Sequence, residues 1–120
     1  MIDREHLRAY CLTKRGAVEE FPFGEEVAVF KVMGKIFALL PVEADPPSIS
    51  LKCDPFLATM LRDTYPAVTP GWHLNKKHWN SVKVDGSVAD DEIEEWIDHS
   101  HEQVIKGLTK AQKAALAHQP

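Results

Sequence analysis

The hydrophobic and polar positions at the start of the chain follow the period of an α-helix. Four residues recur at the three- and four-residue spacing of one helix face: Leu7, Tyr10, Cys11 and Lys14. Asp3 is placed to cap this helix, Ile2 precedes the cap as a staple residue, and Gly16 is a natural stop. The pattern predicts an amphipathic helix whose apolar side needs a partner.

The pattern then changes to runs typical of β-strands. Residues 18–23 (VEEFPF) predict a short extended piece, and Pro22 places it at an edge or a bend of a sheet. Runs at 27–32 and 35–40 flank the pair Met33-Gly34, which predicts a hairpin with a tight turn. The second run is almost wholly apolar, so we expect it to lie centrally in the sheet.

A loop, a strand and a helix follow. The proline-containing residues 41–47 predict a loop, and residues 48–53 alternate apolar and polar positions as a half-buried strand does. Asp54-Pro55 is a strong helix start, because a capping carboxylate precedes proline at the first helical position. The helix should end by Tyr65-Pro66. Its expected buried stripe is Phe56, Leu57, Met60 and Leu61.

The second half of the chain predicts two further strands. Residues 72–74 are expected to be extended, and Asn75 is placed to cap a single turn at 76–78. Residues 79–84 predict a strand that the turn Asp85-Gly86 closes.

A long amphipathic helix comes next, and Ser87 or Asp90 is placed to cap it. Six of its residues lie within one broad stripe: Ile93, Trp96, Ile97, Ser100, Val104 and Leu108. A weaker helical stretch starts at Thr109, with Gln112 placed for a capping box, and its Ala- and Lys-rich end is expected to fray.

This order of elements predicts an α+β fold, a two-layer sandwich in which an antiparallel sheet has its helices packed on one face. A chain of 120 residues is most simply one domain. We assign residues 1–108 to this single domain and residues 109–120 to a C-terminal tail that contains the short helix.

The composition is that of a globular protein with a real core, with 44% hydrophobic and 27% charged residues. The N-terminus is charged from its third residue, unlike a signal peptide, and no apolar run reaches the roughly 18 residues of a membrane span. Cys11 and Cys53 lack CxxC spacing and are typical of small buried thiols. We therefore expect a cytoplasmic protein without a membrane partner, and favour a monomer.

The net charge of −4 means that any affinity for nucleic acid must come from a local patch. Residues 71–84 form the candidate patch, since they include no acidic residue. They carry three lysines, two histidines and two tryptophans: Lys76, Lys77, Lys83, His73, His78, Trp72 and Trp79. Residues 90–102 then hold seven acidic residues and no Lys or Arg. Opposite charges are thus separated along the chain.

Several stretches together resemble the MmcQ/YjbR family of small bacterial proteins. They are residues 16–24 (GAVEEFPFG), 49–55 (ISLKCDP), 69–82 (TPGWHLNKKHWNSV), 85–86 (DG) and 97–100 (IDHS). The match runs over roughly residues 4–108. The resemblance implies a fold similar to bacterial frataxin (CyaY-like) and a DNA-binding role through strand-and-loop wings.

For DNA binding, lysines would meet phosphates, histidine or asparagine would donate hydrogen bonds, and an exposed tryptophan would stack on a base. The candidate residues are His73, Asn75, Lys76, Lys77, His78, Trp79 and Lys83. The alternative is that the tryptophans belong to the core while the lysines solvate a loop and a strand. Whether the patch is larger depends on how other cations align with it in space: Arg4, Arg8, Arg15, Lys31, Lys35 and Lys52.

The acidic helix offers a different candidate site. Glu94, Asp98 and His101 are spaced four and three apart, so they project from one flank and suit a divalent metal ion. The resemblance to frataxin-like proteins, which bind iron through acidic surface, makes this the runner-up. A solvated polar face whose first-turn acids complement the helix dipole explains the same residues. We expect no metal and no cofactor.

Enzymatic activity is not expected, because the chain contains no GxSxG, P-loop, GxGxxG or HExxH motif. Residues 98–101 (DHSH) contain the letters of a hydrolase triad, but Ser100 falls on the buried stripe. A remaining possibility is a module that binds protein or small ligands on its sheet face. Five aromatic residues would then line a groove or, alternatively, fill the core: Phe21, Phe23, Phe30, Phe37 and Trp72.

Overall fold

The structure of the chain, a computed structural model, describes residues 2–71 and 74–118. In chain order its elements are α1 (Arg4–Leu12), β1 (Ala17–Glu20), β2 (Val27–Val32), β3 (Lys35–Pro41), β4 (Ser48–Lys52), α2 (Pro55–Thr64), β5 (Val68–Pro70), β6 (Trp79–Lys83), α3 (Asp90–Lys106) and α4 (Lys110–Ala117). Helices combined with an antiparallel sheet confirm the predicted α+β class. Among the described residues, no helix is long and apolar enough to cross a bilayer.

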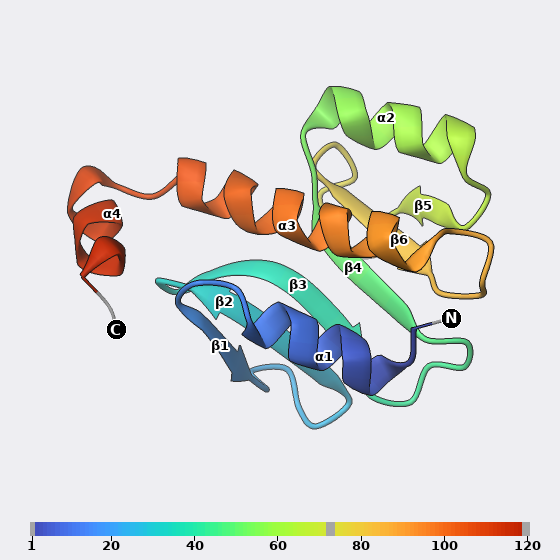
Figure 1. Cartoon of the computed structure of the whole chain (residues 1–120), viewed down its shortest axis with the longest axis horizontal. Coiled ribbons are helices and arrows are strands. Elements are labelled where there is room, and N and C mark those ends of the chain that lie inside the picture. Colours follow the sequence, from blue (N-terminus) through green and yellow to red (C-terminus); the bar gives the residue numbers. More distant parts are fainter. Residues whose placement is uncertain (1, 72–73, 119–120) are drawn as a thin grey trace.

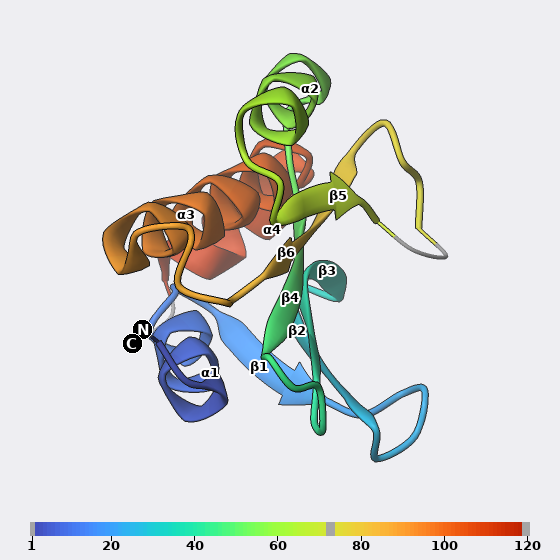
Figure 2. The same cartoon turned by 90° about the vertical axis from the view of Figure 1, so that its right-hand side faces the viewer.

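The strands form one sheet in the order β1-β2-β3-β4-β6-β5, and each neighbouring pair is antiparallel. Helices α1 and α3 lie side by side on one face of this sheet (Figure 1, Figure 2). Helix α2 packs against β5 and β6 at the far end of the sheet. The predicted layers are therefore present, and the expected likeness to frataxin stays a prediction.

Helix α1 begins as its sequence predicts and ends earlier. The Asp3 carboxylate accepts a hydrogen bond from the His6 amide at 2.8 Å, and Ile2 is buried in front of it. The helix ends at Leu12, not at Gly16, because Thr13 closes its last turn with backbone and hydroxyl hydrogen bonds to the Tyr10 carbonyl. Further along the chain, Gly16 has a φ of 74° and turns it into β1.

The predicted hairpin is confirmed, with β2 and β3 joined by Met33-Gly34. Both turn residues have positive φ, 51° and 80°, as a two-residue turn of this twist requires. Strand β3 lies inside the sheet between β2 and β4, and β1 lies at an edge.

The core lies between the sheet and α1 and α3. Its largest fully buried side chains include Phe30, Phe37, Leu7, Leu40, Ile49, Ile93 and Ile97. Ser100 is buried among them on α3, as predicted. Its hydroxyl accepts a hydrogen bond from the Lys52 amide at 2.8 Å and donates one to the Phe37 carbonyl. It thus bridges β3 and β4 just beyond the last paired residues of the two strands.

The buried stripe predicted for α2 is wrong at Phe56 and Met60, whereas Leu57 is half-buried and Leu61 packs against the core. Phe56 is 78% exposed and Met60 is 50% exposed, whereas Ala58 is completely buried. The helix rests on β5 and β6 through Ala58 and the neighbouring Arg62, so Phe56 and Met60 point away from the protein. The predicted start is correct, because the Asp54 carboxylate caps the helix and Pro55 is its first residue.

Three further expectations need correction or completion. The fifth strand is Val68–Pro70, ahead of the predicted residues 72–74, of which 72 and 73 lie outside the described residues. The N-cap of α3 is Ala89, without a side-chain hydrogen bond, because Ser87 bonds the Asp85 carboxylate instead. The predicted capping box of α4 is present, and the buried Leu116 holds this helix against the domain.

Candidate nucleic-acid interface

The loop from Leu74 to His78 contains a tight turn held by two hydrogen bonds to Asn75. The side-chain oxygen of Asn75 accepts from the Lys77 amide at 2.9 Å, and its carbonyl accepts from the His78 amide at 3.1 Å. The predicted capped turn is therefore confirmed. His78 returns the chain to the sheet, since its carbonyl accepts from the Cys53 amide at 2.7 Å. The turn holds Lys76 and Lys77 outward, and both are exposed.

A glycine permits the close approach at the base of this loop. Gly71 donates its amide hydrogen to the Trp79 carbonyl at 2.9 Å. A Cβ atom at Gly71 would lie 2.9 Å from the Trp79 Cβ and 3.3 Å from that of Leu74. A larger residue would therefore push the two arms of the loop apart. The candidate His73 and the neighbouring Trp72 lie outside the described residues.

Arg62 of α2 holds the loop in place through hydrogen bonds, a role that was not predicted from the sequence. Its guanidinium donates to the side-chain oxygen of Asn80 at 2.6 Å, to the Trp79 carbonyl at 3.1 Å and to the Lys76 carbonyl. Asn80 is 3% exposed and donates in turn to the Ala58 carbonyl at 3.4 Å. The available signal was that Arg62 comes four residues after Ala58, on the same helical face.

The register of β4 and β6 separates two faces. Val82 pairs with Ile49 and Asn80 with Leu51, and all four are buried toward α2 and α3. The intervening residues project from the opposite face, because successive side chains of a strand alternate. They are Ser48, Ser50, Lys52, Trp79, Ser81 and Lys83, joined by Thr69 of β5. We call this surface, together with the exposed Lys76 and Lys77, the basic face.

Lysines and hydroxyl groups dominate the basic face. The hydroxyls of Ser50 and Ser81 are 2.9 Å apart, and Trp79 is half-buried beside Lys52 in the strand register. Within residues 2–71 and 74–118, no carboxylate lies within 4.0 Å of the ammonium of four lysines: Lys52, Lys76, Lys77 and Lys83. Asp85 lies in the turn after Lys83, and its pKa is lowered chiefly by hydrogen bonds from Ser87, with a smaller contribution from Lys83.

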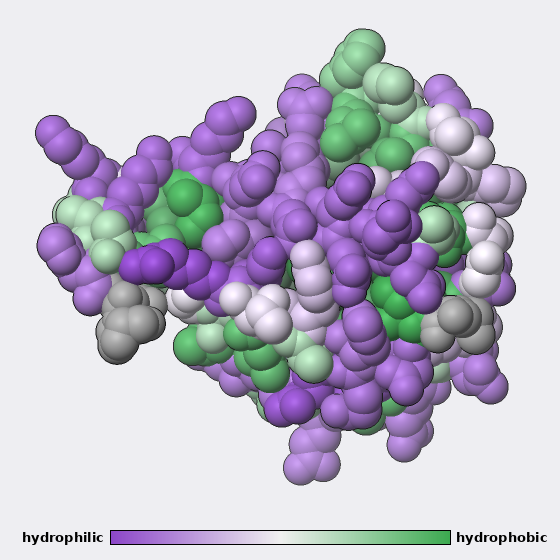
Figure 3. Space-filling model, in the orientation of Figure 1, coloured by the Kyte–Doolittle hydropathy of each residue, from purple (hydrophilic) through white to green (hydrophobic). Residues whose placement is uncertain are grey.

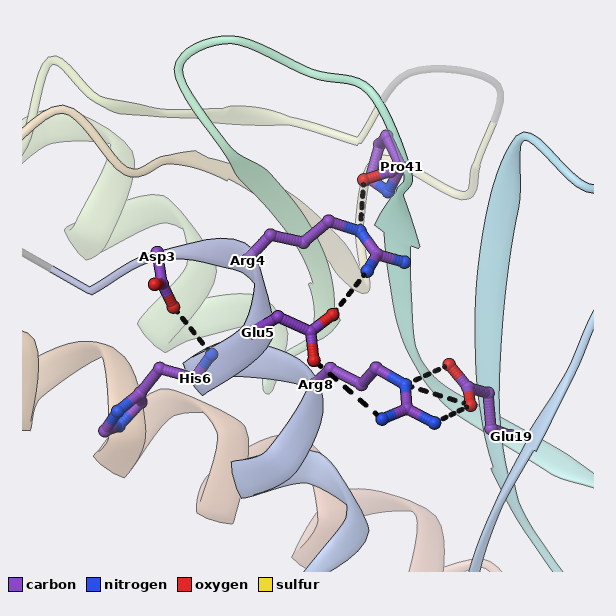
Figure 4. A network of polar contacts seen from close by, with 7 residues as sticks. All are labelled: Asp3, Arg4, Glu5, His6, Arg8, Glu19 and Pro41. Atoms are coloured by element: carbon purple, nitrogen blue, oxygen red, sulfur yellow. Dashed lines mark hydrogen bonds and ion pairs between the residues drawn. The ribbon is translucent and has the colours of Figure 1, made fainter.

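Four of the additional cations considered from the sequence have partners elsewhere: Arg4, Arg8, Arg15 and Lys31. The Arg8 guanidinium makes bidentate hydrogen bonds to the Glu19 carboxylate. Arg4 donates to the Glu5 carboxylate and to the Pro41 carbonyl (Figure 4). Lys31 pairs with Glu20 at 2.9 Å. Arg15 donates to the carbonyls at the end of α4. Lys52 lies on the basic face through the register of β4, whereas Lys35 is exposed at the start of β3, next to the Met33-Gly34 turn.

Two acidic residues of α3, Glu94 and Asp98, pack toward α1, on the side of the sheet away from the basic face. Glu94 contacts His6 at 2.7 Å, and Asp98 accepts from the Tyr10 hydroxyl at 2.8 Å and from the Lys14 ammonium. The His101 ring bonds the Arg15 carbonyl at 2.9 Å and lies edge-on to Phe37. Each predicted metal ligand thus has a separate partner.

No group of three or more His, Cys, Asp or Glu side chains in the described part of the chain is arranged to hold a metal ion. Glu94 and Asp98 are therefore part of the contact between α1 and α3, and His101 contacts the turn after α1 and Phe37 of β3. The acidic helix leaves the lysines of the basic face unneutralised because the sheet lies between them.

The thiols lack the character of nucleophiles. Cys11 and Cys53 are free and buried, and burial raises the pKa of Cys11 to about 12 and that of Cys53 to about 11. Cys53, Asn80 and His99 line a small cavity, but the His99 ring already accepts a hydrogen bond from the Asp54 amide at 3.2 Å.

The five aromatic residues considered for a groove divide between core and surface. Phe30 and Phe37 are fully buried and pack together, with ring centroids 6.4 Å apart. Phe21 and Phe23 are 46% and 67% exposed in the segment after β1. Trp72 lies outside the described residues.

Comparison with known proteins gives consistent results. The YjbR family model matches residues 12–103. The protein YjbR of Escherichia coli K12, described as uncharacterized, is 34% identical over 110 residues, which cover 92% of this chain and 93% of that protein. YbdF of Escherichia coli O157:H7, also described as uncharacterized, is 40% identical over 90 residues, covering 75% of this chain and 74% of that protein.

Solved structures extend the similarity to the fold. The crystal structure of Deinococcus radiodurans protein DR2400, with a DUF419 domain, superposes with a TM-score of 0.88 at 39% identity, covering 94% of this chain and 86% of that one. The crystal structure of a Pseudomonas syringae protein superposes with a TM-score of 0.73 at 27% identity, covering 86% and 99% of the two chains.

Proposed function

The chain belongs to the YjbR family, and from that premise we propose that it is a non-enzymatic DNA-binding protein whose basic face contacts the phosphates. The observation that carries the proposal is the gathering of Lys52, Lys76, Lys77 and Lys83 on one surface without carboxylate partners among the described residues. Phosphate contacts from lysine supply most of the sequence-independent affinity for DNA.

The hydroxyl groups between these lysines support the same proposal. Ser50 and Ser81 face each other across β4 and β6, and Thr69 pairs with Ser81 across β5 and β6. Serine and threonine hydroxyls donate readily to phosphate oxygens and fit close to the backbone of a nucleic acid. In this proposal the lysines attract the duplex and the hydroxyls set its distance from the sheet.

The remaining candidates of the loop have a shaping role. The side-chain oxygen of Asn75 accepts a hydrogen bond from the Lys77 amide. The His78 carbonyl accepts one from the amide of Cys53, directly after β4. Trp79 is half-buried at the start of β6, and we assign it to shaping the loop rather than to stacking on a base. We propose that these residues hold Lys76 and Lys77 in position and that the lysines make the contact.

The overall negative charge is compatible with this role because the charges lie on separate faces. The carboxylates of Glu94 and Asp98 face α1 across the sheet from the basic face. At about 0.15 M salt the Debye length is about 8 Å, so charges on the far side of a sheet and a helix layer are largely screened. Local charge therefore governs the encounter at physiological salt.

The test is the salt dependence of binding to a fluorescein-labelled 20-base-pair duplex, followed by fluorescence anisotropy. If each lysine neutralises one phosphate, log Kd changes with log salt concentration with a slope of about 3.6. Lys76→Ala/Lys77→Ala should weaken binding and reduce that slope by about 1.8. Lys52→Ala/Lys83→Ala should act in the same way.

The matched control is Lys110→Ala/Lys113→Ala, which removes the same charge from α4. These two lysines are exposed and belong to the C-terminal helix rather than to the basic face. The control should bind as the wild type does. Absence of wild-type binding at 50 mM salt, or equal losses in the control and the two test variants, would refute the proposal.

A further inference from the structure

Helix α4 folds back at the end of α3 (Figure 1), and the two helices border an open groove. The groove has a volume of about 590 Å³, within the range of roughly 300–1,000 Å³ that is typical of small-molecule sites. Figure 3 shows a hydrophobic area in this region, bordered by hydrophilic side chains. The lining comes from the turn after α1 and from both helices, and it includes Arg15, His101, Ile105, Lys106, Lys113 and Leu116.

Arg15 holds the two walls of this groove together. Its guanidinium donates to the Leu116 carbonyl at 3.1 Å and to the Ala117 carbonyl at 2.9 Å, at the end of α4. Its own carbonyl accepts a hydrogen bond from the His101 ring on α3 at 2.9 Å. The groove is therefore formed before any ligand arrives, which lowers the entropic cost of binding.

The floor of the groove is apolar. Ile105 lies one turn after His101 on α3 and packs, partly buried, against the core. Leu116 of α4 lines the same groove and is 4% exposed. This floor suits an alkyl chain, because a polar group placed on it would lose its hydrogen bonds to water without regaining them.

The rim of the groove is cationic. Lys106 ends α3, Lys113 lies one turn before Leu116 on α4, and both lysines are exposed. Within residues 2–71 and 74–118, no carboxylate lies within 4.0 Å of either ammonium. Glu102, one turn before Lys106, also lines the groove. The rim therefore attracts an anion, and Glu102 makes a single negative charge more favourable than the two of a phosphate dianion.

Two other open grooves of similar volume are less suited to an anion. One, of about 680 Å³ between the β1–β2 and β3–β4 loops, is lined by Glu25, Glu26 and Glu43. The other, of about 600 Å³ beside α1, contains two arginines that already contact carboxylates. The groove between α3 and α4 is therefore the better match to a negative charge.

We propose that the groove between α3 and α4 binds a medium-chain fatty-acid anion. Its carboxylate lies between Lys106 and Lys113, and its alkyl chain runs along the apolar floor toward Arg15. A fatty acid combines the single charge that the rim attracts with the methylene groups that the floor takes out of water. The groove is bordered by α3, across the sheet from the basic face, so the inference does not depend on the DNA-binding function proposed above.

The test is a titration with octanoate, followed by NMR of the Ile105 and Leu116 methyl groups and of the His101 ring. Saturable shifts of these resonances are expected at millimolar octanoate, below the concentration at which the acid self-associates. Hexanoate is two methylenes shorter and should bind about 4- to 15-fold more weakly, because each buried methylene strengthens binding about fourfold. The uncharged 1-octanol should also bind more weakly than octanoate, because it lacks the carboxylate.

Lys106→Ala/Lys113→Ala should weaken octanoate binding about 2- to 30-fold, because two exposed ion pairs with the carboxylate are lost, and should leave 1-octanol binding unchanged. The matched control is Lys35→Ala/Lys110→Ala, which removes the same charge from two exposed lysines outside the groove. It should bind octanoate as the wild type does. Thermal melting of both variants verifies the fold, which changes at exposed residues should hardly affect.

Three results would overturn the fatty-acid site. The absence of saturable shifts at Ile105, Leu116 and His101 would reject binding in the groove. Equal affinities for octanoate and 1-octanol, or equal losses in the test and control variants, would reject recognition of the carboxylate by the rim. Shifts centred on the exposed Phe56 of α2 would show that the alkyl chain binds another apolar surface.

Discussion

Replacing Arg62 by alanine should destabilise the protein by about 3 kcal/mol. The guanidinium makes three hydrogen bonds that join α2 to the loop and to β6: to Asn80 at 2.6 Å, to Trp79 at 3.1 Å and to Lys76. Hydrogen bonds to charged groups contribute about 1.5–3 kcal/mol each. The bond to Lys76 is excluded from the sum, because this exposed carbonyl finds water once the arginine is gone.

The remaining two acceptors determine the magnitude. Asn80 is 3% exposed, so its side-chain oxygen would be left buried without a donor, and the part-buried Trp79 carbonyl would keep only its hydrogen bond from the Gly71 amide. Two bonds at the lower limit give about 3 kcal/mol, or a melting temperature roughly 10 °C lower for a domain of this size. Arg62→Lys keeps the positive charge but lacks the planar guanidinium that donates to several acceptors at once. We therefore expect about half of the decrease in the free energy of unfolding.

The assay is urea unfolding followed by circular dichroism, with Asp63→Ala as the exposed control on the same helix. A double-mutant cycle between Arg62→Ala and Asn80→Ala isolates the shared bond and should give a coupling energy of about 1–2 kcal/mol. A loss below about 1 kcal/mol for Arg62→Ala, or a coupling energy of zero, would show that the three hydrogen bonds do not hold the loop. Both the stability loss and the coupling energy can be interpreted only if the m-value of the urea transition is unchanged.

Two other predictions concern buried groups. Ser100→Ala should lower the free energy of unfolding by about 2 kcal/mol, because the Lys52 amide and the Phe37 carbonyl lose their shared partner; an unchanged urea midpoint would contradict this role. Stability should fall as the pH rises from about 9 to 12, since burial raises the pKa of Cys11 to about 12 and of Cys53 to about 11, and burial with the Asp98 contact raises the pKa of Tyr10 to about 12. The folded state binds these protons more tightly than the unfolded state, so their stabilisation is complete below the unfolded pKa values of 9.0 and 10.0 and is lost above them. Urea midpoints at pH 8 and pH 11 test the sign, and equal midpoints would contradict it.

Local chemistry was predictable from the sequence. The caps at Asp3, Asp54 and Thr109 and the turn at Asn75 were assigned correctly, because each depends on groups within three residues of one another. The Met33-Gly34 hairpin belongs to the same class. The alternation of residues 48–53 also predicted which side chains of β4 share a face.

The environment of each helix depended on its neighbours. Helix α2 has apolar residues on two sides, and the packing of Ala58 and Arg62 on β6 decided that Phe56 and Met60 would face solvent. The spacing of Glu94 and Asp98 was read correctly as one flank of α3. Only the approach of α1 showed that this flank binds His6 and Tyr10.

The sequence by itself determined the element types, the caps, the α+β class and the family, because these follow from short-range spacing and from similarity along the chain. The tertiary structure decided which side of the sheet each charge occupies and which apolar side chains remain exposed. Those properties arise from contacts between residues far apart in sequence, such as Arg62 with Lys76 and Tyr10 with Asp98. No local pattern encodes them, since the same helix face can pack against a strand or remain in water.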